Sequence, residues 1–143
     1  MPTLPSVTPA VSTWLQAQRV RRNPEQSAAA PALARLLADR GYPVLQSALD
    51  FEALWGGVVW GGEEPHDQAM LGPWAVLTSE AEAFARPRRH ELPLVTIAYG
   101  PGDSALYIDA TGAIWHQELV EDPAPKRLAS SFAELLESLA SAP

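Results

Sequence analysis

The chain contains no cysteine among its 143 residues. Disulfides, thiolate metal sites and a cysteine nucleophile are therefore excluded, and this absence suits a reducing compartment. The sequence also lacks any apolar run near the roughly 18 residues that a membrane-spanning helix needs. Its first residues do not show the basic stretch and apolar core of a secretory leader. We therefore expect a cytoplasmic protein with no membrane partner.

Positive charge is scarce as well. Ten Lys and Arg stand against 17 Asp and Glu, which gives a net charge of -7. This balance argues against a nucleic-acid partner, because phosphate binding relies on a surplus of basic residues. An acidic surface better suits a basic protein. The length and the 47% of hydrophobic residues predict one compact domain over residues 1–143, with fraying expected at 1–8 and 141–143.

Helical patterns occupy the first part of the chain. Cap residues and apolar side chains at helical spacing predict three helices that begin near Thr8, Pro31 and Ser47. The second is expected to end at Gly41 and the third at the pair Gly56-Gly57, because glycine favours the C-terminal cap. The first is followed by basic residues that suit a helix C-terminus, namely Arg19, Arg21 and Arg22.

The rest of the chain reads mainly as strands. Residues 58–60 predict a first strand, 61–72 a polar, glycine-rich loop and 73–78 a second strand, before a helical turn over 79–85. Residues 92–119 form short apolar blocks broken by glycine turns, which predicts three antiparallel strands. Residues 120–129 are expected to be a connector.

A closing helix is predicted from Ser131. Glu134 follows three residues later, which is the spacing of a reciprocal capping pair. Four apolar side chains then share one face of the helix, namely Phe132, Leu135, Leu136 and Leu139. A meander covered by a helix is a scaffold and not an arrangement of catalytic residues.

Four stretches of the chain together resemble the SUKH superfamily, a group of bacterial immunity proteins and their yeast relatives. They are the helix-to-strand junction "LDFEALWGGVVW", the strand "PLVTIAYG", the hairpin "ALYIDATGAIWH" and the end "LASSFAELLESLA". In that superfamily a short helix ends in a glycine pair before the first strand. An "LY-x-D-x-x-G" hairpin later precedes a "SF-x-x-(F/L)-L" helix. The resemblance covers residues 41–141 and leaves 1–40 without a counterpart.

The resemblance implies an α+β fold, with a mostly antiparallel sheet of about four to six strands flanked by N-terminal helices and a C-terminal helix. It implies no catalysis, cofactor or metal. Many bacterial members resemble antidotes that bind and neutralise a toxin domain, often a nuclease or deaminase. The expected partner is thus a cognate, basic toxin protein, and the chain itself is expected to be a monomer or weak homodimer. The alternative is a regulatory or scaffolding module without a toxin, because fold alone does not prove function.

The histidines give little support to catalysis or metal binding. His66, His90 and His116 each have an acidic residue nearby but lack the short spacing of metal ligands. The chain also has no Gly-x-Ser-x-Gly motif of a serine hydrolase. A small hydrolase or ligand-binding enzyme remains a rival hypothesis, and it needs His90, Asp103 or His116 to converge in one pocket.

A partner-binding site is predicted around the segment that follows the first strand. Tryptophan supplies much of the buried area of an interface, while carboxylates at its rim steer a basic partner. Trp60 and Trp74 flank an acidic segment, and a second acidic cluster leaves the last strand of the meander. The predicted partner-binding residues are Trp60, Glu63, Glu64, Asp67, Trp74, Glu118, Glu121 and Asp122. The alternative is that both indoles are buried in the core.

Overall fold

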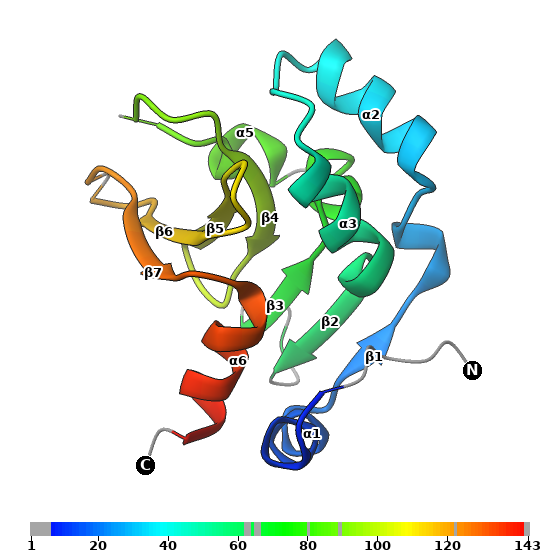
Figure 1. The fold of residues 1–143 in the computed structure, drawn as a ribbon, viewed down its shortest axis with the longest axis vertical. Helices are drawn as coiled ribbons and strands as arrows, with labels where there is room; N and C mark the ends of the chain where they lie inside the picture. Colours follow the sequence, from blue (N-terminus) through cyan, green and yellow to red (C-terminus); the bar gives the residue numbers. More distant parts are fainter. Residues whose placement is uncertain are drawn as a thin grey trace.

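The computed structural model describes residues 7–61, 64, 67–79, 81–88, 90–121 and 123–141 (Figure 1). The helices are α1 (Pro9–Ala17), the 3-10 turn η1 (Pro24–Gln26), α2 (Ala30–Asp39), α3 (Gln46–Trp55), α4 (Pro73–Leu77), α5 (Glu82–Ala85) and α6 (Phe132–Ser141). The strands are β1 (Arg21–Arg22), β2 (Val58–Gly61), β3 (Gln68–Leu71), β4 (Val95–Tyr99), β5 (Ser104–Ile108), β6 (Ile114–Glu118) and β7 (Lys126–Ala129). The predicted α+β class is confirmed.

The strands form one antiparallel sheet in which each strand pairs with the next along the chain. Over the described residues its order is β1-β2-β3-β4-β5-β6-β7, so it has seven strands and exceeds the predicted four to six. Figure 1 shows that the sheet is strongly twisted between the β2–β3 hairpin and the β5–β6–β7 part. Because neighbouring strands alternate in direction, connections that follow every second strand meet at the same end of the sheet.

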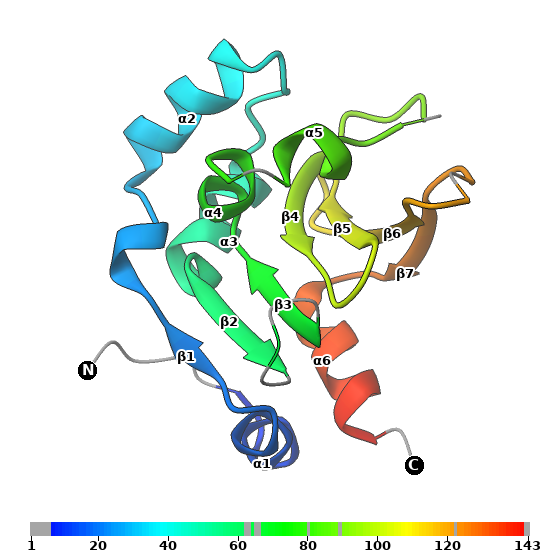
Figure 2. The same ribbon diagram turned by 180° about the vertical axis from the view of Figure 1, so that it is seen from behind.

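The two faces of the sheet are covered unequally. Helices α1, α2, α3 and α6 bury the larger core against one face, with Leu33, Leu37 and Leu136 almost fully buried in it. Helix α4, which follows β3, contributes Leu77 to the larger core, whereas α5 lies against the other side of the sheet when it is seen from behind (Figure 2). There Val76 and Tyr107 belong to a second and smaller apolar cluster.

Several of the predicted helix ends are confirmed. Thr8 Oγ1 accepts the Val11 amide at 3.4 Å and caps α1, and Gly41 follows α2 with a φ of 78°. Ser131 Oγ accepts the Glu134 amide at 3.1 Å at the start of α6. The Glu134 carboxylate, however, accepts a hydrogen bond from Ser130 Oγ.

Other local predictions are wrong. Ser47 does not cap α3, because its hydroxyl donates to the carbonyl oxygen of Asp109 at 2.6 Å. Of the residues predicted to form the basic end of the first helix, Arg19 lies between α1 and β1, and Arg21 and Arg22 form β1, where Arg21 pairs with Val59. Leu139 is 40% exposed, so it lies at the edge of the buried face of α6.

The region between β2 and β4 also differs from the prediction. Residues 68–71, expected to be loop, form β3, and residues 73–78, expected to be a strand, contain α4. A short apolar run does not distinguish a strand from a buried helix. Pro73 sits in the first turn of α4, where its missing amide costs nothing. Residues 126–129, expected to be connector, form β7, whose charged and exposed side chains are typical of an edge strand.

The expected fraying concerns few described residues. Residues 1–6 and 142–143 lie outside the described part of the chain. Within the described part of the chain, Thr8 caps α1 and Ser141 is the last residue of α6.

Candidate protein-binding surface

Antiparallel pairing brings the two predicted acidic segments to the same end of the sheet. Gly61 pairs with Gln68 at the tip of the β2–β3 hairpin. Ser104, the first residue of β5, pairs with Glu118, the last residue of β6. We call this end, formed by the described residues of 61–68, 100–104 and 118–126, the acidic end. The β2–β3 hairpin and the end of β6 are separated there by β4 and β5.

The described carboxylates of the acidic end are all exposed to solvent. They are Glu64, Asp67, Asp103, Glu118 and Glu121. Glu63 and Asp122, the remaining predicted acidic residues, lie outside the described part of the chain. Asp103 was not part of the predicted surface, and it joins because the β4–β5 turn lies between the two predicted segments.

The connection after β6 is held in place by a buried amide. Gln117 is 1% exposed, and its Nε2 donates to the carbonyl oxygens of Arg88 at 3.1 Å and Pro123 at 2.8 Å. Glu118 and Glu121 therefore project from a backbone that is tied on both sides. Such positions lose less conformational entropy when a partner binds.

Basic residues stand near the same end. Arg21 donates from Nη2 to Gln68 Oε1 at 3.4 Å, and Arg88 donates to the carbonyl oxygen of Leu119 at 3.1 Å. Lys126 begins β7. The acidic end therefore carries both signs of charge, with the carboxylates concentrated in its loops.

The two predicted tryptophans occupy different places. Trp60 lies next to the β2–β3 hairpin tip, half-buried, with its ring 5.8 Å from that of Trp14 and 6.4 Å from that of Phe132. Trp74 lies in α4, beyond the far end of β3, so it does not flank the acidic hairpin as expected. Strand β3, which the sequence had not indicated, carries the chain away from that hairpin. Both indoles are half-buried and pack against the larger core.

The polar groups of the rival enzyme hypothesis belong to three different segments of the chain. His90 Nδ1 lies 2.6 Å from the carbonyl oxygen of Leu92, ahead of β4. His116 lies within β6, with its Nε2 3.8 Å from Glu118. Asp103 lies in the turn before β5, and His66 is outside the described residues. Within the described part of the chain, no group of three or more His, Asp and Glu could hold a metal ion.

One carboxyl group is buried. Glu52 in α3 is 3% exposed, and its Oε1 accepts the backbone amide of Trp74 at 2.8 Å, which caps α4. Its Oε2 has no hydrogen-bond partner among the described residues. Burial raises the pKa of Glu52 to about 7, although the amides of Trp74 and Ala28 and the charge of Arg22 act in the opposite direction. The sequence offered one signal, a glutamate on the apolar side of a helix.

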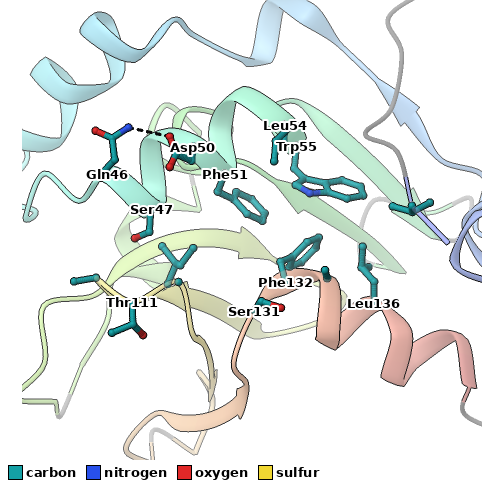
Figure 3. A pocket seen from close by; sticks show the side chains of 15 residues that line it. Gln46, Ser47, Asp50, Phe51, Leu54, Trp55, Thr111, Ser131, Phe132 and Leu136 are labelled. Carbon is teal, nitrogen blue, oxygen red and sulfur yellow. Dashed lines mark hydrogen bonds between the residues drawn. The ribbon is translucent and has the colours of Figure 1, made fainter.

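An open groove separates α3 from α6 (Figure 3). Its floor is made by almost fully buried apolar side chains, and the Phe51 and Phe132 rings meet edge to face at 4.9 Å. Leu54 is 53% exposed and lines the groove. Gln46 and Asp50 form a polar margin, joined by a 2.8 Å hydrogen bond. The groove has a volume of about 570 Å³ and reaches the β5–β6 turn.

Comparison with protein-family models, with curated proteins and with solved structures finds no match for this chain.

The groove was not predicted, although a signal for it exists. Residues 48–55 contain more apolar positions than one buried helix face needs, with Leu49, Leu54 and Trp55 spread around α3. Leu54 belongs to the apolar pattern of this helix, yet its side chain is 53% exposed. Among the described helices, none is both long and apolar enough to cross a membrane.

Proposed function

We propose that this protein is a non-enzymatic, cytoplasmic binding protein that neutralises a bacterial toxin by covering its active site. The observation that carries the proposal is the set of exposed carboxylates in three connections at one end of the sheet. The resemblance of four sequence stretches to immunity proteins supports it independently.

The physical role of the acidic end is to accelerate association. Nuclease domains are basic where they hold phosphate, and an opposing negative field raises the rate constant of encounter. Trp60 stands beside the β2–β3 hairpin, and the accessible part of its indole supplies apolar area within the charged surroundings. The affinity for the toxin would then come from the apolar contacts around Trp60, and the high association rate constant from the carboxylates of the acidic end.

Neutralising Glu64, Asp67 and Glu121 together, as Gln, Asn and Gln, is expected to slow binding of the cognate toxin domain about tenfold at low salt. The difference should shrink at high salt because ions screen the field. The measurement is the association rate constant of purified partners, with the toxin domain first identified by recovery from the source lysate at low and high salt.

The matched control removes three exposed carboxylates elsewhere, at Glu25, Asp39 and Glu91. Both triple variants change the net charge equally, so equal slowing would show that overall charge matters and the acidic end does not. Recovery of no toxin, or of many unrelated proteins, would favour the regulatory module instead.

A further inference from the structure

The groove between α3 and α6 continues along α6 into a second hollow. Val7, Ala133 and Leu136 line both, so the two hollows form one elongated depression. The second has a volume of about 400 Å³ and extends toward Val11 in α1. An elongated apolar depression beside helices suits an extended or helical segment better than a compact small molecule.

The charges along the groove have one sign. Asp50 is the charged residue that lines the first hollow, and Glu137 is the one that lines the second. No lysine or arginine stands among the described residues that line either hollow. A segment that carries Lys or Arg beside its apolar side chains would therefore meet complementary charge at both ends.

We propose that this groove binds an amphipathic helical segment of another protein, with apolar side chains one turn apart and basic residues flanking them. The exposed Leu54 and the aromatic floor would receive the apolar side chains, while Asp50 and Glu137 face the basic ones. The groove reaches the β5–β6 turn, which lies at the opposite end of the strands from the acidic end. The proposal therefore adds a second surface and does not depend on toxin neutralisation.

A second copy of this chain fits the groove less well. A two-fold dimer places the same patch of each copy against the other. The acidic residues Asp50 and Glu137 would then lie in the same interface as Asp50 and Glu137 of the other copy, in a chain that already carries a net charge of -7. Like charges across an interface oppose association.

The test uses a fluorescently labelled synthetic peptide of leucine and lysine, about 15 residues or four helical turns long. Its leucines are placed at helical spacing. Ala133→Arg is expected to weaken binding by about tenfold or more, because Ala133 is exposed, lines both hollows and would gain a long cationic side chain there. Ser138→Arg is the control, since it adds the same charge to an exposed position of α6 that lines neither hollow. It should change affinity by less than about twofold.

Leu54→Ala tests the apolar contacts separately, because it removes apolar area from the groove without changing its charge. It is expected to weaken binding about threefold or more. A scrambled peptide of the same composition, which has no apolar face, should bind more weakly than the patterned one.

Four results would overturn the proposal. One is an equal loss of affinity in Ala133→Arg and Ser138→Arg, which would indicate general electrostatics. Others are undiminished binding of the scrambled peptide, and equally tight binding of a version with glutamate in place of lysine. The last is concentration-dependent dimerisation that Ala133→Arg alone abolishes, which would make a second copy the occupant.

Discussion

Replacing Glu52 by glutamine is expected to abolish a fall in stability that the wild-type protein shows as the pH rises. The free energy of unfolding of the wild type, compared with that of Glu52→Gln, should decrease by about 2 kcal/mol between about pH 5.5 and about pH 8.5. The Gln side chain can still accept the Trp74 amide through its oxygen, so the cap of α4 is retained.

The sign follows from the direction of the shift. Burial raises the pKa of Glu52 from 4.5 to about 7 in the folded protein. Between these values the folded state holds a proton that the unfolded chain has released, so the free energy of unfolding falls as the pH rises. The contribution is fully present below the unfolded value and is lost above about pH 7. Arg22 is the charged group that favours the ionised form, and it only partly offsets the cost of burial.

Urea unfolding followed by tryptophan fluorescence at several pH values measures this difference directly. The series should begin above the isoelectric point of about 4.8, because at that pH the protein carries little net charge and tends to precipitate. Glu25→Gln makes the same chemical change at an exposed carboxyl group and serves as the control. Parallel curves for the wild type and Glu52→Gln would show that this carboxyl group does not control the pH dependence.

Local patterns were sufficient for most of the sheet and several helix ends. The glycine-punctuated blocks of residues 92–119 became β4, β5 and β6 because their turns connect strands that pair with their immediate neighbours. The cap of α1 at Thr8 and the glycine after α2 were likewise readable from a few adjacent residues.

Elements that depend on distant contacts could not be predicted. Helix α4 begins where the Glu52 side chain, 22 residues earlier in the chain, accepts its first free amide. Strands β1 and β7 are short, polar edge strands, and within the described part of the chain they pair with β2 and β6 respectively. Their composition gives no apolar alternation, so the sequence pattern does not identify them as strands. They are recognised as strands only from their pairing with the neighbouring strand in the folded structure.

The same distinction applies to the predicted surface. The acidic segments were visible as clusters of carboxylates, and strand direction then placed them at one end of the sheet together with Asp103. Trp74 was misplaced because the chain between it and the hairpin was taken for loop. The groove required the packing of α3 against α6, two helices separated by most of the sheet in sequence.

Gly57→Ala is expected to destabilise the fold by at least about 3 kcal/mol, and Gly41→Ala by only about 1 kcal/mol. Both glycines have a φ of 78°, so alanine has the same unfavourable backbone conformation at each site. A Cβ at Gly41 would meet nothing within 4 Å, whereas one at Gly57 would lie 2.3 Å from the backbone oxygen of Asn23. The comparison therefore separates backbone strain from steric exclusion.

Relief of that clash by a small backbone movement is opposed by two hydrogen bonds. The Gly57 carbonyl oxygen accepts the Asn23 amide at 2.9 Å, and the Gly57 amide donates to the Leu71 carbonyl oxygen at 3.1 Å. Moving Gly57 away from Asn23 would break the contact that holds the segment before η1 against the start of β2. Urea unfolding of both variants gives the two free energies. Equal losses would mean that φ alone requires glycine here, while a larger loss at Gly57 would make this glycine a packing requirement at the junction of α3, β2 and the N-terminal segment.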